Sequence, residues 1–290
     1  MKHIGRLALF LFLAVNAFFI GMLLLTAYSP YINPEVHPVQ SCLGLTFPIF
    51  LVINFCFLVF WLIVRYRLAL VPLLGFLLCY PQIRTYMPIN MEPSGQPENS
   101  IKLLSYNIMS FGNMKKENGQ NPILNYIKNS KADIVCMQEY AGSETAKIHL
   151  NNKEIRQALK DYPYRHIKQV GKTGAGSQIA CYSKFPILSA RMLDYQSNYN
   201  GSMVYDIKIG KDTVLLINNH LESNKLTRED KVVYEDMLKD PKAGKVKSGI
   251  RQLVNKLAEA SAIRSAQARA IAQEIARSPY PSVIVCGDFN

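Results

Sequence analysis

The sequence predicts an α/β domain with buried central sheets, preceded by an apolar membrane segment. Between Leu7 and Ile83 the only full charges are Glu35, Arg65 and Arg67, whereas the C-terminal two thirds of the chain carries most of the rest. In that C-terminal part, short apolar runs alternate with patterns of helical periodicity. Several of these runs are continuously apolar, which is typical of strands covered on both faces. With 49% hydrophobic residues among 290, the chain is too apolar to be disordered.

Two charge-free runs of 22 residues, Leu7–Tyr28 and Leu43–Val64, are long enough to cross a bilayer. A helix rising about 1.5 Å per residue would cover the ~30 Å hydrocarbon core. A third run, Leu68–Ile83, has 16 residues and two prolines, so it is either a short third span or a re-entrant segment. A cleaved signal peptide would have a shorter apolar stretch and a small-residue cleavage site. We therefore expect a membrane domain over residues 1–89 with two to three transmembrane helices.

Positive charges predict the orientation of these helices. Lys2 and Arg6 precede the first run, Arg65 and Arg67 follow the second, and the connection 29–42 has no positive charge. Because Lys and Arg accumulate on the cytoplasmic side, the N-terminus and the link after the second run should both be cytoplasmic. We expect the third run to cross, which would place the following domain outside the cytoplasm. A re-entrant third run would instead leave that domain in the cytoplasm.

Residues 90–100, rich in Pro, Gly, Ser and Asn, are predicted to be a linker, and the polar domain extends over residues 101–290. The expected strands are Ile101–Asn107, Asp133–Gln138, Gln178–Ser183, Met203–Ile209, Thr213–Asn219 and Ser282–Cys286. The expected helices, with Asn121 and Thr227 as N-caps of the first and third, are Pro122–Asn129, Lys153–Lys160, Arg228–Leu238 and about Gly249–Arg277.

The polar domain is basic, with 28 Lys and Arg against 18 Asp and Glu from Ser100 onward. This excess favours polyanionic partners such as nucleic acid, phosphoinositides or an anionic bilayer, although a solubilising lysine-rich surface explains it equally well. The six cysteines form no CxxC pair. Because Cys136, Cys181 and Cys286 lie within apolar runs, we expect them to be buried, reduced thiols.

Polar side chains recur where the predicted strands end, namely Asn107, Glu139, His220, Asp288 and Asn290. Taken singly, each has an ordinary explanation as a turn, cap or hydrogen-bonded core residue. Strand ends, however, can aim side chains at a ligand with little loss of order. As a set these residues provide carboxylates for a hard divalent cation and for orienting water, with neutral donors for phosphate oxygens.

The runs LSYNI, DIVCMQE, INNHLES and VIVCGDFN, in this order and spacing, resemble the endonuclease/exonuclease/phosphatase superfamily. That superfamily includes deoxyribonuclease I, exonuclease III-type repair endonucleases, neutral sphingomyelinases and inositol polyphosphate 5-phosphatases. The resemblance covers roughly Ile101 to Asn290, and the apolar N-terminal segment is similar to that of membrane-anchored bacterial members. It implies a deoxyribonuclease I-like four-layer α/β/β/α sandwich preceded by N-terminal transmembrane helices.

The resemblance also implies a reaction that depends on Mg²⁺, with Mn²⁺ as a substitute. Asn107 and Glu139 would lie at the metal, with Glu139 as the direct ligand. Asp288 would orient or deprotonate the attacking water, Asn290 would hold this water and a phosphate oxygen, and His220 would hydrogen-bond the phosphate. Mg²⁺ typically takes one or two protein carboxylates and keeps several waters, which agrees with so sparse a ligand set.

The implied function is that of a membrane-anchored metal-dependent phosphoesterase that hydrolyses phosphodiester or phosphomonoester bonds by metal-activated water attack. Its substrate would be a nucleic acid, a sphingolipid or an inositol phosphate. Its other partner would be the lipid bilayer, and no obligate protein partner is expected. The catalytic domain would face outward from a bacterial inner membrane. The alternative is a non-catalytic module that binds an anionic ligand or a partner.

Family members close the site with a further Asp and an Asp-His pair after GDFN, whereas this sequence ends at Asn290. We therefore expect the catalytic domain to be incomplete at its C-terminus, as a fragment of a longer protein rather than a disabled copy. Within Lys225–Arg277 we expect a lysine-rich loop, either solvated or facing substrate or lipid, and then an alanine-rich helix against the sheet. Residues 171–178 lack the P-loop pattern and are expected to form a hairpin loop near the site.

Overall fold

A computed structural model of the chain describes residues 2–90, 95, 97, 100–112, 119–142, 150–171, 177–195, 197, 199–224, 226–239 and 243–290. The chain divides into two compact units, and each is considered by itself below. One comprises Met1–Ser94 with Lys225–Ala262, and the other Gly95–Asn224 with Ile263–Asn290.

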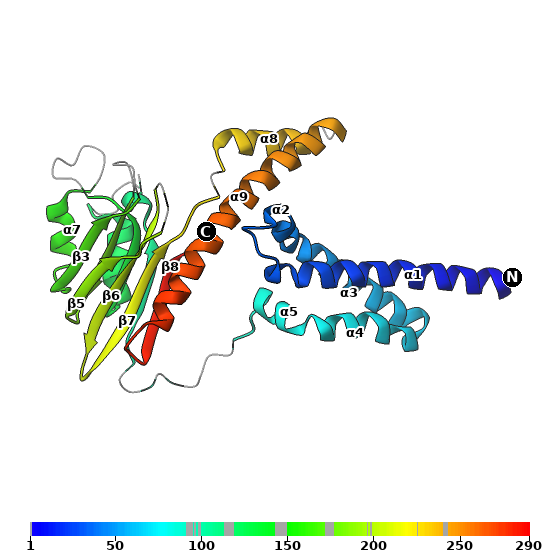
Figure 1. The fold of residues 1–290 in the computed structure, drawn as a ribbon, viewed down its shortest axis with the longest axis horizontal. Helices are drawn as coiled ribbons and strands as arrows, with labels where there is room; N and C mark the ends of the chain where they lie inside the picture. Colours follow the sequence, from blue (N-terminus) through cyan, green and yellow to red (C-terminus); the bar gives the residue numbers. More distant parts are fainter. Residues whose placement is uncertain are drawn as a thin grey trace. The chain divides into compact units, whose positions relative to one another are not determined.

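In the first unit, two long helices form from the two predicted apolar runs (Figure 1). Helix α1 spans Lys2–Ala27 and helix α3 spans Phe47–Val64, with the short helix α2 at Pro38–Ser41 before it. The segments Leu7–Ala27 and Pro38–Val64 are each long and apolar enough to cross a membrane. Short 3-10 helices lie at Ser29–Tyr31, Cys42–Thr46 and Tyr66–Ala69.

The third apolar run forms two helices, α4 at Leu70–Leu78 and α5 at Tyr80–Tyr86. The chain bends by 65° between them. Pro81 in the first turn of α5 explains the break, because a proline ring lacks the amide hydrogen that would continue α4. A broken span and a re-entrant segment both fit this geometry.

A buried polar cluster joins α1 to α3. Trp61 Nε1 donates to Asn16 Oδ1 at 2.9 Å, and Asn54 Nδ2 donates to the carbonyl of Phe19 at 3.0 Å. Asn16, Asn54 and Trp61 are all fully buried. Tryptophan is often found at the membrane interface, but the Trp61 ring is fully buried and bonded to α1. Satisfied polar groups of this kind specify how two apolar helices pair, because an unpaired one in an apolar setting is costly.

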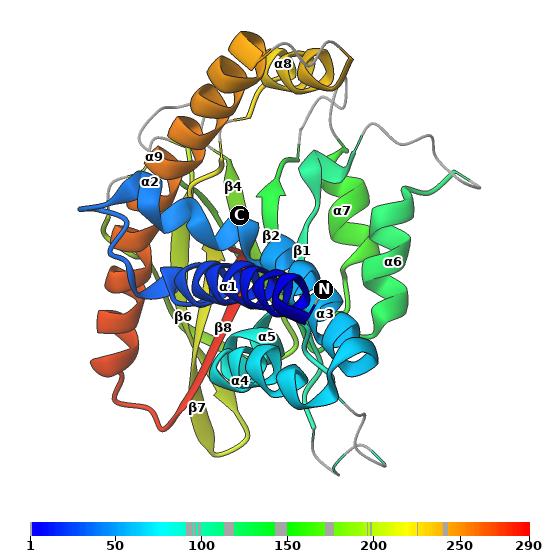
Figure 2. The same ribbon diagram turned by 90° about the vertical axis from the view of Figure 1, so that its right-hand side faces the viewer.

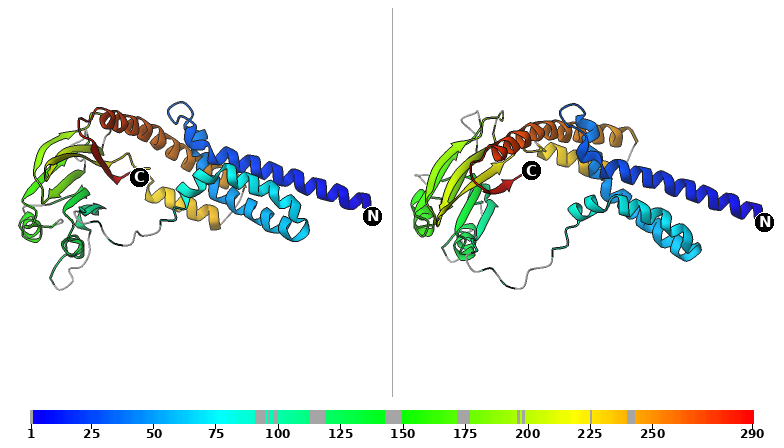
Figure 3. Two further views of the ribbon diagram at one scale, coloured as in Figure 1. Left: turned by 90° about the horizontal axis from the view of Figure 1, so that it is seen from below. Right: turned by 60° about the horizontal axis from the view of Figure 1, so that its bottom comes forward.

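Helices α8 at Arg228–Lys239 and α9 at Ala243–Ala276 form where helices were predicted, and they leave only residues 240–242 of the expected lysine-rich loop between them, which lie outside the described residues. Thr227 caps α8 as predicted, because its Oγ1 accepts from the Asp230 amide. Helix α9 begins before the predicted Gly249 and runs without a break (Figure 3). Gly249 is buried where an added Cβ would meet Met237 of α8, so packing outweighs its weak helix propensity.

The second unit contains two four-stranded sheets, β1-β2-β4-β3 and β5-β6-β7-β8. Strands β1/β2 and β7/β8 are parallel, and the remaining neighbours are antiparallel. The strands are β1 Leu103–Asn107, β2 Ile134–Tyr140, β3 Tyr164–Gln169, β4 Gln178–Ser183, β5 Ile187–Met192, β6 Gly201–Ile209, β7 Asp212–His220 and β8 Ser282–Asp288. A 3-10 turn at Met109–Phe111 follows β1.

Strands β3 and β5 are absent from the sequence prediction. Both lie at sheet edges, where one side of the strand has no neighbour and many side chains face solvent. Their mixed sequences, YRHIKQ and ILSARM, therefore lack the apolar runs that mark the central strands.

Figure 2 shows the layers of this unit in order, with α6 and α7 on one side of the sheets and α9 on the other. Helices α6 (Pro122–Ser130) and α7 (Asn152–Ala158) pack on Val135 and Met137 of β2. The alternate residue Cys136 faces the second sheet, and Ile271 of α9 packs on the outer face of that sheet. This arrangement confirms the predicted four-layer α/β/β/α sandwich.

Polar and sulfur-containing groups also lie between the sheets. Gln138 Nε2 of β2 donates to Asn218 Oδ1 of β7 at 2.6 Å, and both residues are buried. Cys136, Cys181 and Cys286 are buried and free, as predicted. The Gln138–Asn218 bond joins the two sheets one residue below Glu139, and so restricts how far they can slide past each other.

We predict that Gly287→Ala destabilises the protein far more than Gly210→Ala does. Gly287 has φ 134°, and an added Cβ would meet the backbone of Asn219 in the neighbouring strand. Gly210 has φ 60° with open space around it, so alanine there should cost about 1 kcal/mol. The cost at Gly287 should reach about 3 kcal/mol. Thermal unfolding of both purified variants would measure the difference, and equal melting temperatures would contradict the close approach of β8 to β7.

Candidate active site

The side chains singled out from the sequence converge where the two sheets meet. Asn107 and Asp288 end β1 and β8, His220 ends β7, and Glu139 is the next-to-last residue of β2. Because β1 is parallel to β2 and β7 is parallel to β8, each pair of strands ends at the same edge of its sheet. The strands run one or two residues further than predicted, so Glu139, His220 and Asp288 belong to the sheets rather than to loops.

The amide of Asn107 links the two carboxylates. Its Nδ2 donates to Glu139 Oε1 at 3.0 Å and to Asp288 Oδ2 at 2.8 Å. Its Oδ1 accepts from the backbone amide of Met109 at 3.1 Å, which fixes the orientation of the amide group. Glu139 lies in the same sheet as Asn107 and Asp288 in the other, so one side chain connects both sheets at the site.

Glu139 has an unusual backbone conformation. Its φ is 51°, in the left-handed region that a non-glycine residue seldom adopts. The register between β2 and β4 shifts between Met137 and Tyr140, so a β-bulge contains Glu139. The bulge allows Gln138 to reach between the sheets while the next side chain, Glu139, reaches Asn107. Strain of this kind is concentrated at functional sites.

Asp288 and Asn290 are positioned by the turn that follows β8. Asp288 Oδ1 accepts from the Asn290 amide at 3.0 Å, while the Asp288 carbonyl accepts from the Leu221 amide at 2.9 Å. Asn290 Nδ2 in turn donates to the Leu221 carbonyl at 2.8 Å. The Asn290 side chain is therefore turned toward the chain after β7, and its backbone amide is the group that contacts the Asp288 carboxylate.

His220 is 4% exposed and lies beside both carboxylates. Its Nε2 is 3.8 Å from Glu139 Oε1, too far for a hydrogen bond. Burial lowers the pKa of His220, although the negative charges of Asp288, Glu139 and Glu222 oppose this shift. The imidazole is therefore neutral near pH 7, and it has one N–H to donate to a ligand.

Two supporting residues were not identified from the sequence. Ser177 Oγ lies 3.3 Å from His220 Nδ1 and forms a hydrogen bond with it. Ser177 belongs to the segment expected as a hairpin loop near the site, of which residues 172–176 lie outside the described residues. Asn219 Nδ2 donates to the Cys286 carbonyl at 2.9 Å and so secures β8 just before Asp288. A single Ser or Asn in a sequence does not indicate a supporting role of this kind, because that role depends on which strand lies next to the residue in the fold.

The donor set suits a hard divalent cation. Two carboxylates and one carboxamide meet at the site, and among the described residues neither Glu139 nor Asp288 forms an ion pair with Lys or Arg. Within the same part of the chain, no group of three or more His, Cys, Asp or Glu could hold a metal. Mg²⁺ needs only one or two carboxylates because it keeps several of its waters, so the residues present fit this ion.

Solved structures similar to this chain include truncated TDP2 from Caenorhabditis elegans, at 19% identity and a TM-score of 0.40, covering 66% of this chain and 62% of that one. D. rerio TDP2 complexed with single strand DNA product has 15% identity, a TM-score of 0.42 and coverages of 67% and 62%. Sphingomyelinase C from Streptomyces griseocarneus has 18% identity, a TM-score of 0.41 and coverages of 67% and 65%. This chain thus spans less than two thirds of each of these structures.

Two families match parts of the chain. A domain of unknown function (DUF8431) matches residues 9–86, and the Endonuclease/Exonuclease/phosphatase family matches residues 104–290. No curated protein matches the chain. The second match covers more than half of the chain and contains all five residues of the candidate site, and so the chain belongs to the endonuclease/exonuclease/phosphatase family.

Proposed function

We propose that the protein is a membrane-anchored, metal-dependent phosphoesterase. The observation that carries this proposal is the convergence of Glu139 and Asp288, from different sheets, on the single amide of Asn107. A neutral His220 beside these carboxylates adds a donor for a phosphate oxygen. Carboxylates that no Lys or Arg in the described part of the chain neutralises, next to a neutral donor, are the groups that metal-dependent hydrolysis of a phosphate ester requires.

Glu139 and Asn107 would hold the metal, which we propose to be Mg²⁺ with Mn²⁺ as a substitute. Glu139 provides a carboxylate oxygen, and the Asn107 amide keeps this carboxylate in place. When bound, such an ion neutralises negative charge on the phosphate oxygens and makes water more acidic.

Asp288 would orient the attacking water and accept its proton. Its two carboxylate oxygens accept from Asn107 Nδ2 and the Asn290 amide, so the group has a defined orientation and lone pairs left for water. His220 would donate its N–H to a non-bridging phosphate oxygen, with Ser177 fixing the ring through Nδ1. Asn290 would assist in holding the water and a phosphate oxygen.

The substrate class that we propose is a phosphoester in a nucleic acid, a sphingolipid or an inositol phosphate, because one such site serves many substrates on this fold. Residues 1–89 would form the membrane domain, 90–100 the linker and 101–290 the catalytic domain. The two helices of spanning length support anchoring in a bilayer. We place the catalytic domain outside the cytoplasm of a bacterial inner membrane, on the basis of the positive charges that flank the apolar runs.

We predict that Glu139→Gln and Asp288→Asn each lower kcat for bis-p-nitrophenyl phosphate by at least about 100-fold, as expected when a metal ligand or a water-orienting group is lost. Asp212→Asn is the matched control, because this exposed carboxylate begins β7, at the end of the strand opposite His220. Initial rates at saturating Mg²⁺ would measure the effects. Wild-type rates in both site variants would refute the assignment of Glu139 and Asp288 to the active site. Absence of hydrolysis by the unsubstituted protein would favour the non-catalytic alternative.

We predict that chelation of divalent metals abolishes hydrolysis and that Mg²⁺ or Mn²⁺ restores it. Asn107→Ala should raise the Mg²⁺ concentration needed for half-maximal activity by about tenfold, because the variant loses the amide that holds the Glu139 carboxylate in place. A titration of activity against Mg²⁺ would show this shift. An unchanged half-maximal concentration would mean that Asn107 acts only through Asp288.

We predict that a reporter fused after Ser100 lies outside the cytoplasm. The positive charges place both ends of the α1–α3 hairpin in the cytoplasm, with Lys2 and Arg6 at one end and Arg65 and Arg67 at the other. Whether the bent α4–α5 pair crosses the membrane therefore determines on which side Ser100 lies. Alkaline phosphatase should be active at this position, and green fluorescent protein should be dark. The opposite pair of signals would show that α4 and α5 re-enter without crossing.

A further inference from the structure

The N-terminal half of α9 has one face fixed against α8. Asp230 of α8 is 2% exposed and accepts from Lys256 Nζ at 2.6 Å, Gln252 Nε2 at 3.0 Å and the Thr227 amide at 2.7 Å. The Lys256 ammonium and the Thr227 amide lower the pKa of Asp230 to about 2, so the carboxylate is charged at any physiological pH. Gly249 lies on the same face, against Met237 and Val233. The rotation of α9 about its own axis is therefore defined.

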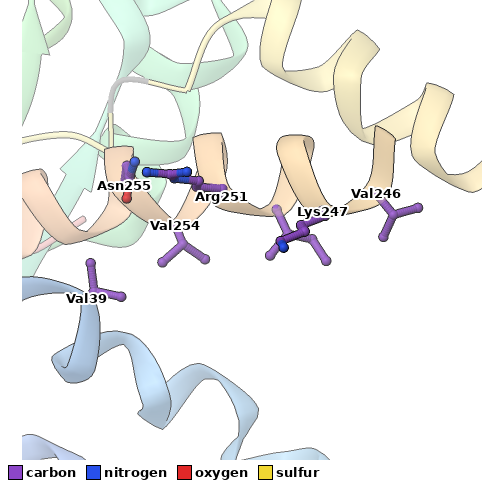
Figure 4. Close-up of a pocket in the computed structure, with 7 residues that line it drawn as sticks. Val39, Val246, Lys247, Arg251, Val254 and Asn255 are labelled. Carbon is purple, nitrogen blue, oxygen red and sulfur yellow. The ribbon is translucent and has the colours of Figure 1, made fainter. Parts of the chain in front are cut away.

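The opposite face of α9 carries an apolar stripe with cations beside it. Val246, Ile250 and Val254 recur every four residues, and Lys247 and Arg251 each follow one of them. At about 100° per residue this set is centred roughly opposite the α8-facing residues. Figure 4 shows Val246, Lys247 and Val254 on the same side of the helix. We call these five residues the α9 stripe.

The α9 stripe is partly open to solvent within its unit: Val246 and Val254 are half-buried, and Val39 of α2 lines the same open pocket (Figure 4). Ile250 is 51% exposed, and Lys247 and Arg251 are also exposed, with no ion pair or hydrogen bond to other described residues. The segment from Lys239 to Lys256 contains six basic residues and one acidic residue. Exposed aliphatic side chains that alternate with cations are typical of helices lying in the interface of an anionic membrane.

The composition of the stripe distinguishes between two anionic partners. A nucleic acid backbone would satisfy Lys247 and Arg251, but it offers no apolar layer for Val246, Ile250 and Val254. A bilayer surface accommodates both the cations and the aliphatic residues, because aliphatic side chains enter the acyl boundary while Lys and Arg extend to the headgroups. The same chain contains two helices of membrane-spanning length. Anchoring through these helices would keep the stripe close to a bilayer at all times, which favours the bilayer as its partner.

We propose that the α9 stripe docks on the anionic surface of the membrane in which the protein is anchored. Val246, Ile250 and Val254 enter the interface, and Lys247 and Arg251 contact lipid phosphates. Charge complementarity and buried aliphatic area act together, and neither is large enough alone for stable docking. This inference rests on the proposed anchoring but not on the proposed hydrolysis.

The test uses the full chain in nanodiscs, with an environment-sensitive fluorophore on Ile250→Cys and with Cys42 and Cys56 replaced by Ala. In discs of phosphatidylcholine with phosphatidylglycerol, the label should brighten severalfold and be quenched by spin-labelled lipid. In discs of phosphatidylcholine alone it should resemble a label on Glu235→Cys of α8, which stays in water. Added salt should reverse the response, because the attraction is screened.

Lys247→Gln with Arg251→Gln should lower the docking equilibrium about 30-fold, since each cation near an anionic surface contributes roughly a fivefold factor. The matched control, Arg228→Gln with Lys231→Gln, also removes one Arg and one Lys, but from α8, and should change docking less than about twofold. An unquenched label in anionic discs, or equal quenching without phosphatidylglycerol, would overturn the proposal. A response to single-stranded DNA in place of anionic lipid would assign the stripe to nucleic acid. Anchoring is checked separately, by whether the chain stays with membranes after an alkaline wash.

Discussion

The site depends on one amide group. Asn107 donates to a carboxylate of its own sheet and to a carboxylate of the opposite sheet, and no other described side chain forms a hydrogen bond with both. Hydrogen bonds to charged acceptors are stronger than neutral ones, yet they weaken steeply when donor and acceptor are misaligned. The position of Glu139 relative to Asp288 therefore depends on how accurately the two sheets are aligned.

Several features keep that alignment. The apolar layer between the sheets resists separation but permits sliding, because hydrophobic contact has no direction. The buried bond from Gln138 to Asn218 is directional, and it lies one residue from Glu139. Within the second sheet, Gly287 lets β8 approach the backbone of β7 more closely than any side chain would allow, which places Asp288 beside His220. The Gln138–Asn218 bond therefore fixes one sheet against the other, and the close approach of β8 to β7 fixes Asp288 within its own sheet.

Charge is distributed in opposite ways at the site and in the α8–α9 segment. The site contains two carboxylates with a neutral histidine, which favours a cation. The first turns of α9 contain most of a local basic excess next to exposed aliphatic residues. A phosphate ester reaching the site would need a metal to balance the carboxylates, whereas lipid phosphates could bind the α9 stripe directly. Binding of substrate and attachment to a surface would then rely on separate groups of residues.

The sequence by itself determined the apolar helices, the six strands with long apolar runs and the polar residues at their ends, because each of these leaves a local pattern of hydrophobicity. Only the tertiary structure decided the edge strands β3 and β5, the early start of α9 and the bond from Asn107 to Asp288. Edge strands lack the burial that produces a pattern, and the packing of Gly249 against Met237 of α8, in the first turns of α9, depends on a tertiary contact. The Asn107–Asp288 pair is 181 residues apart, so its formation depends on how the two sheets pack and not on any local preference.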